Sequence, residues 1–270
     1  MSFALDPATL DLTTLGALMG AAFIAGFIDA IAGGGGLITV PALALGGLDP
    51  LAVLATNKLN GTFGSFAATW SFFRAGLLDL RRIWPVAVYS GGGALIGALA
   101  LPLVPREVIA AALPVALISI ALYFVFSPRM SDADAHRRMS PLVFNLTLLP
   151  AVGFYDAIFG PGTGSFFMMG FVGLAGYGII RATAQTKLAN FASNVVALFF
   201  YTLGGHIVWS VGLAMGVAQF IGSRLGARAA IRSGAALVRP LLIVMCLALA
   251  IKLAVTPGQP LAEWLKHFWG

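Results

Sequence analysis

The chain has 270 residues, of which 59% are hydrophobic and only 10% are charged. A soluble domain carries roughly 25% charged residues, so this composition excludes a soluble globular protein, and it also excludes disordered, collagen-like and disulfide-rich secreted classes. The net charge of +6 does not indicate nucleic acid as a partner, because most Arg and Lys residues lie at the ends of apolar runs, as in the cytoplasmic loops of membrane proteins. We therefore expect an all-α polytopic membrane protein.

A helix needs about 20 apolar residues to cross the hydrocarbon core of a bilayer. Eight stretches of roughly this length are predicted to be spanning helices, and two short apolar stretches each follow a glycine cluster. A polar loop at 128–140, predicted to be cytoplasmic, divides the chain almost in half. The first half contains 12–32, the short 37–48, 57–75, 83–104 and 107–127; the second contains 141–160, the short 165–177, 187–205, 207–227 and 237–256.

The two halves share a pattern of residues. The segment that begins at Gly26 (GFIDAI) recurs as GFYDAI at Gly153, an offset of 127 residues, and Lys58-Leu59 recurs as Lys187-Leu188, an offset of 129. Gly93 and Gly97 likewise match Gly222 and Gly226. The matching order, spacing and residue types predict an internal duplication, with repeats at about 12–127 and 141–256 inside one transport domain, 1–270.

The basic residues indicate how the repeats are oriented. If the short stretches cross the membrane, the arginine-rich loops near 74–82, 129–138, 181 and 224–239 share one side; if they are re-entrant, the arginines divide almost evenly. The positive-inside rule favours the first arrangement. Five passes per half is an odd number, so the second half enters from the opposite face. The sequence predicts inverted repeats, with both termini outside the cytoplasm, in the cell (inner) membrane.

Interrupted helices in inverted repeats are typical of secondary transporters, whose sites lie near the midplane. A half-helix that begins after each glycine cluster would direct its free N–H groups into a shared cavity, and helix N-termini bind anions. The alternative is that the glycines only permit close helix packing. The predicted substrate-binding residues of the two clusters are Gly33, Gly34, Gly35, Gly36, Thr39, Gly162, Thr163, Gly164 and Ser165.

Two lysines at duplicated positions form a second candidate group. Lys58 and Lys187 each lie near the start of a long apolar run, where a lysine can simply extend its ammonium group to the interface. Each is also flanked by amides, which a lipid-facing lysine does not need. Two ammonium groups around one cavity would hold an anion. The remaining substrate-binding residues predicted here are Asn57, Asn60, Thr186, Asn190 and Asn194.

Asp29 and Asp156 are the third matched pair, each four residues before its glycine cluster. A carboxylate inside a membrane segment is costly and indicates function. Three roles stay open: pairing with a lysine, capping the half-helix, or carrying a proton. The single cysteine, Cys246, and three dispersed histidines give no reason to expect a metal or another cofactor.

The residues so far favour a transporter over an enzyme. An anion channel with the same midplane site is the main alternative. An intramembrane hydrolase would need Ser165 and His206 as a pair, and nothing in the sequence orients that histidine. Assembly into a homo-oligomer is left open.

These blocks resemble the TauE/SafE family of membrane transporters, the sulfite exporter group. The resemblance lies in Gly26 to Pro41 (GFIDAIAGGGGLITVP), Ala55 to Lys58 (ATNK), Gly153 to Ser165 (GFYDAIFGPGTGS) and Gln185 to Lys187 (QTK). It implies transport of a small sulfur-containing anion such as sulfite, sulfoacetate or a related organosulfonate. Cys246 lies outside these motifs, which argues against the cysteine-relayed thiosulfate uptake of a related superfamily.

Overall fold

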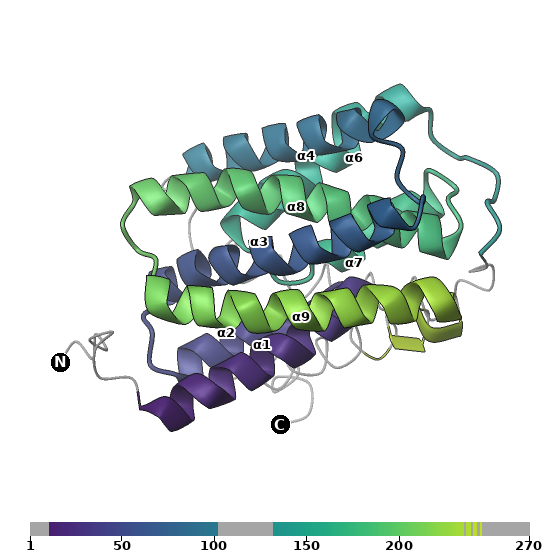
Figure 1. Ribbon diagram of the computed structural model, residues 1–270. Helices are drawn as coiled ribbons and strands as arrows, with labels where there is room; N and C mark the ends of the chain where they lie inside the picture. The colour runs from purple at the N-terminus through teal and green to yellow at the C-terminus, as the bar shows by residue number, and fades with distance from the viewer. Residues whose placement is uncertain (1–10, 102–131, 235, 239, 242–243, 245–270) are drawn as a thin grey trace, which may run out of the picture.

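The computed structural model describes residues 11–101, 132–234, 236–238, 240–241 and 244, and every regular element within them is helical. The helices form an elongated bundle (Figure 1). The predicted helix 107–127 lies outside the described residues, as does most of 237–256. The helices are α1 (Leu12–Ala32), α2 (Gly36–Leu45), α3 (Pro50–Arg74), α4 (Leu80–Ala100), α6 (Pro141–Ile158), α7 (Thr163–Gly173), α8 (Ile179–Leu203) and α9 (Trp209–Ser233).

Three helices in the described part of the chain are long and apolar enough to cross a membrane: α1, Ile83–Ala100 within α4, and α6. Helices α2 and α7, with 10 and 11 residues, are apolar but shorter. Helices α3, α8 and α9 have 25 residues each, a length of about 37 Å at 1.5 Å per residue. They carry lysines, amides or arginines, and these residues lower the mean hydropathy of the three helices.

Two predicted helix boundaries are wrong. The stretches 57–75 and 187–205 were expected to begin near the lysines, whereas α3 begins at Pro50 and α8 at Ile179. Asp49 caps α3 by accepting the N–H groups of Leu51 and Ala52 at 3.0 and 3.2 Å, and proline suits the first turn. The predicted starts are too late because the less apolar residues that precede each apolar run also belong to the helix. Lys58 and Lys187 are therefore two turns from a helix end.

The two halves pack on each other in a reciprocal way. Helix α1 packs on α9, and its counterpart α6 packs on α4. At both contacts, glycines on both helices bring the two backbones so close that a Cβ atom would overlap the facing chain, which is how small residues act between membrane helices. The six contacts are Gly26 on Gln219, Gly222 on Phe23, Gly226 on Phe27, Gly93 on Pro150, Gly97 on Phe154 and Gly153 on Ser90.

The central helices α3 and α8 run in opposite directions (Figure 1). Lys58, near the start of α3, bonds Asn194 late in α8, and the ring of Phe66 further along α3 lies 5.5 Å from that of Phe191, earlier in α8. Helix α2 leads from the end of α1 back to the start of α3 (Figure 1). The short segment thus reverses the chain between two helices that share a direction.

Most of the arginines in the described residues lie toward one end of the bundle. There α3 ends at Arg74, α8 begins close to Arg181, and α9 ends close to Arg232 (Figure 1). The segment after residue 131 lies at the same end, because the N–H of Ala135 donates to the carbonyl of Gly176 at 2.8 Å, and Asp134 pairs with Arg181. The α8–α9 loop at the opposite end carries no arginine.

Candidate functional site

The two glycine-rich segments that interrupt the helices, one between α1 and α2 and one between α6 and α7, meet inside the bundle, and they are called the two breaks below. Gly33 and Gly34 follow α1 with φ of 81° and 90°, and Gly160 and Gly162 precede α7 with φ of 83° and 86°. Only glycine adopts this left-handed region at little cost. A Cβ on Gly33 would lie 2.8 Å from the carbonyl carbon of Gly164. The N-termini of α2 and α7 therefore lie beside each other.

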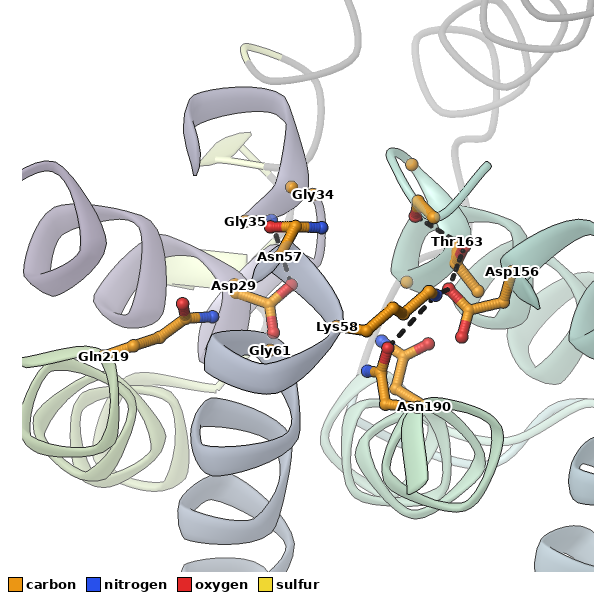
Figure 2. Close-up of a pocket in the computed structure, with 15 residues that line it drawn as sticks. Asp29, Gly34, Gly35, Asn57, Lys58, Gly61, Asp156, Thr163, Asn190 and Gln219 are labelled. Carbon is orange, nitrogen blue, oxygen red and sulfur yellow. Dashed lines mark hydrogen bonds and ion pairs between the residues drawn. The ribbon is translucent and has the colours of Figure 1, made fainter. Parts of the chain in front are cut away.

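A small cavity of about 40 Å³ opens between these N-termini (Figure 2). It is lined from both halves, by residues of α1, α3, α6, α8 and α9, by the first residues of α2 and α7, and by the two breaks. Most of the predicted site residues line it: Asp29, Gly34, Gly35, Gly36, Asn57, Lys58, Asp156, Gly162, Thr163, Gly164, Asn190 and Asn194.

The lysines are buried, and each forms an ion pair with an aspartate of the other half. Lys58 Nζ lies 2.9 Å from Asp156 Oδ1, and Lys187 Nζ lies 3.0 Å from Asp29 Oδ2. The lysine side chains are only 3% and 0% exposed, so neither extends to a membrane interface. Of the roles that the sequence left open for the aspartates, pairing with a lysine is the one formed here, and Lys58 lines the cavity while Lys187 lies behind its wall.

The aspartates combine two of the roles left open by the sequence. Besides its lysine, Asp29 accepts the N–H of Gly35 at 3.0 Å and so helps to cap α2. Asp156 accepts the hydroxyl of Thr163, at the start of α7, at 2.9 Å. Each carboxylate therefore ties a half-helix of its own half to a lysine of the other.

The asparagines direct amide groups toward the cavity. Asn57 accepts the hydroxyl of Thr39 at 2.5 Å through its Oδ1, while its Nδ2 lies 3.6 Å from the position of a Cβ on Gly36. Asn194 accepts a hydrogen bond from Lys58 Nζ at 3.2 Å. Asn190 Oδ1 is buried and has no hydrogen-bond partner among the described residues. The N–H₂ groups of Asn57 and Asn194 are thus left as donors.

The other predicted residues lie behind the cavity wall. Gly33 contacts the opposite break, Thr39 holds Asn57, and Lys187 holds Asp29. Asn60 is buried, with its Nδ2 3.9 Å from the sulfur of Met215. Ser165 and Thr186 are buried, and neither lines the cavity.

Three lining residues escaped the sequence analysis: Gly61, Gly160 and Gln219. A signal existed for two of them. Gly160 is the first glycine of the second cluster, and Gln219 is the single amide side chain in the predicted helix 207–227. Gly61 carries no such signal, because its contact with Asn194 depends on how α3 packs against α8.

The hydrolase pair is not formed. Ser165 is buried near the start of α7, whereas His206 is exposed in the α8–α9 loop and borders a different hollow with Asp49 and Trp209. A serine nucleophile needs its histidine within hydrogen-bond reach. This arrangement therefore provides no route to acyl-transfer chemistry.

The charges around the cavity give it a small positive bias. Lys58, Lys187, Asp29 and Asp156 sum to zero if all four are ionised. The N-termini of α2 and α7 then each add about half a positive charge. The groups around the cavity therefore sum to a slightly positive charge.

Known proteins similar to this chain are named as probable membrane transporters. A relative from Sinorhizobium, "Probable membrane transporter protein ORF9", is 53% identical over 92% of this chain and 95% of its own. "Probable membrane transporter protein YfcA" of Escherichia coli K12 is 41% identical over 93% and 94%, and a "Probable membrane transporter protein" of Haemophilus influenzae is 39% identical over 87% and 92%. No solved structure matches significantly.

The sequence model of one family, described as "Sulfite exporter TauE/SafE", matches residues 18–253. That range includes both glycine breaks, both lysines and both aspartates of the cavity. The family resemblance seen in the motifs is therefore confirmed, and the chain belongs to the TauE/SafE family of membrane transporters.

Proposed function

We propose that the protein is a secondary transporter that moves a small sulfur-containing anion, such as sulfite, sulfoacetate or a related organosulfonate, by alternating access. The observation that carries this proposal is the pair of half-helix N-termini that open on one buried cavity, next to Lys58. Helix N-termini of interrupted helices bind anionic substrate groups in other transporters. The membership of the family, with its sulfite exporter description, supports the choice of substrate class.

The donors around the cavity suit a sulfonate or sulfite group. Such a group carries oxygen atoms that accept several hydrogen bonds from different directions. The amides of Asn57 and Asn194 and the ammonium of Lys58 line the cavity together with the first residues of α2 and α7 (Figure 2).

Alternating access needs two bundles that can rock against each other around a fixed site. The reciprocal contacts between α1 and α9 and between α6 and α4, together with the opposite directions of α3 and α8, support an inverted repeat. The crosswise ion pairs hold the two halves together at the site. Rocking would loosen one crosswise pair while the other is kept.

The arginine-rich end of the bundle is proposed to face the cytoplasm, following the positive-inside rule. The loop 128–140 then lies inside, and both termini lie outside the cytoplasm, in the cell (inner) membrane. The short helices α2 and α7 turn back toward opposite ends of the bundle (Figure 1), so the cavity lies near mid-depth.

Flux measurements in liposomes test the proposal and separate a carrier from a channel. Protein reconstituted with sulfite or sulfoacetate on one side should show saturable uptake and exchange of labelled for unlabelled anion. The paired variant Lys58→Gln/Asp156→Asn should lose most of this flux, whereas Gly92→Ala, at a glycine with open space around it, should retain it. Currents far above carrier turnover would identify a channel, and absence of flux for all the anions would overturn the proposal.

A further inference from the structure

Resting on the proposed anion transport, we propose that the two aspartates of the site differ in function: Asp29 is the group that binds a coupling proton, and Asp156 is a structural anchor. The halves place each aspartate at the same point of the repeat, opposite a lysine of the other half. Apart from the lysine, the two carboxylates have different partners, and these differences assign the proton to Asp29.

Asp156 is held by hydroxyl groups as well as by its lysine. Its Oδ1 accepts from Lys58 and from the hydroxyl of Thr163 at 2.9 Å each, and its Oδ2 accepts the hydroxyl of Ser193 at 2.6 Å. The side chain is only 3% exposed. A proton that bound Asp156 would displace one of these donors and leave a buried polar group without its partner, which is costly.

Asp29 has fewer partners and more access to the cavity. It accepts one bond from Gly35 N–H and one from Lys187, and its side chain is 13% exposed. The reason lies in the sequence. Gly36 begins α2 where Thr163 begins α7, and Gly64 occupies the position that matches Ser193. Neither hydroxyl exists in the first half.

Gln219 fills the space that the missing hydroxyl leaves. A Cβ on Gly64 would lie 2.8 Å from both Cγ and Nε2 of this glutamine. Gln219 is 3% exposed, lines the cavity beside Asp29 (Figure 2), and its Oε1 has no partner among the described residues.

The charged groups around Asp29 explain how a proton would couple to an anion. Lys187 of α8 contacts it directly, and Lys58 of α3 and Asp156 of α6 share the cavity. The described residues of α2 and α7 contain no titratable side chain, and Arg224 and Arg228 of α9 are exposed. When Asp29 takes up a proton, its charge changes from −1 to zero, and Lys187 is left uncompensated. The site becomes more positive by one unit and binds an anion more tightly.

The coupling is reciprocal, so anion binding should draw a proton onto Asp29. Affinity should rise as the pH falls, by up to about tenfold per pH unit where one proton is linked to one anion. Asp29→Asn mimics the protonated state. This variant should bind the anion at least as tightly as the wild type and without pH dependence, whereas a merely structural role of Asp29 predicts weaker binding.

Calorimetry of the full chain in detergent tests this directly. Methanesulfonate and sulfite are titrated in buffers of different ionisation enthalpy, and the protonation of free sulfite is measured separately and subtracted. The wild type should take up about one proton per anion and Asp29→Asn none. Asp156→Asn should melt at a lower temperature, as expected of a structural anchor, and Gly92→Ala, outside the cavity, should retain the uptake.

If Asp29→Asn does not fold, Asp29→Asn/Lys187→Gln removes both charges together and should also abolish proton uptake. Unchanged uptake in either Asp29 variant, or no uptake in a wild type that binds the anion, would overturn the assignment of Asp29 and leave the transport proposal standing. A wild type that binds neither anion at any pH would instead refute the anion site itself.

Discussion

Gly33 and Gly164 bring the two chain breaks into direct contact: a Cβ on Gly33 would lie 2.8 Å from the carbonyl carbon of Gly164, and a Cβ on Gly164 would lie 2.8 Å from Gly33 Cα. These glycines are far apart in the sequence, yet their contact sets the distance between the N-termini of α2 and α7. The shape of the cavity depends on it, because any side chain at this point would push the half-helices apart.

Gly164→Ala should therefore destabilise the protein and weaken anion binding. The added methyl group meets backbone on one side and Asn190 Nδ2 at 3.2 Å on the other, and overpacking of this kind costs about 1–3 kcal/mol. Thermal unfolding in detergent, with and without sulfite, measures both effects. Gly92→Ala, inside α4 with no atom within 4 Å of its Cβ position, should be neutral or slightly stabilising. Equal behaviour of the two variants would contradict the contact.

The crosswise pair between Lys58 and Asp156 should show strong coupling in a double-mutant cycle. Lys58→Gln and Asp156→Asn each leave a buried charge without its partner, which costs about 3–5 kcal/mol. The double variant should lose much less than the sum of the two. Chemical unfolding of all four proteins gives the coupling energy, and additive losses would show that the pair is not formed.

An exposed ion pair serves as the control for that cycle. Arg181 and Asp134 pair near the arginine-rich end, with side chains 52% and 43% exposed. Surface pairs contribute about 0–1 kcal/mol. Arg181→Gln should therefore change the free energy of unfolding far less than Lys58→Gln. Each substitution removes one positive charge, from α8 in the first case and from α3 in the second.

Asn57 should determine the affinity for anions through its amide donor. In Asn57→Asp, an oxygen can still accept from Thr39, but a negatively charged oxygen replaces the N–H₂ group toward the cavity. Anion affinity should fall at least about tenfold, a change of about 1.4 kcal/mol. Asn145→Asp makes the same charge change outside this cavity and should leave affinity unaltered. Stronger anion binding by Asn57→Asp would show that the site does not select for negative charge.

Two exposed histidines report the orientation in the membrane. His136 lies at the arginine-rich end and His206 in the α8–α9 loop. With Cys246 replaced by serine, His206→Cys should react in intact cells with a thiol reagent that does not cross the membrane. His136→Cys should react only after the cells are opened. The reverse pattern would place the arginines outside and refute the proposed topology.

Much of the site follows from local pattern. The glycine clusters, the matched lysines and the matched aspartates are all visible as repeats, and most of the residues predicted from them line the cavity. The predicted starts of α3 and α8 are too late because both helices contain polar residues that contact the other half. The fall in hydropathy that these residues cause lies inside each helix and does not mark its end. Gly61 was missed because its importance comes from a neighbour on another helix.

The amino-acid sequence by itself determined the class of protein, the matched motifs of the two halves and the residue types at the breaks, because composition and spacing are properties of the chain alone. Only the tertiary structure decided that each lysine pairs with the aspartate of the opposite half, and that one aspartate acquires two hydroxyl donors while the other faces a glutamine. These partners are distant in sequence. The close packing of helices at their glycines determines which lysine lies beside which aspartate, and the composition alone does not.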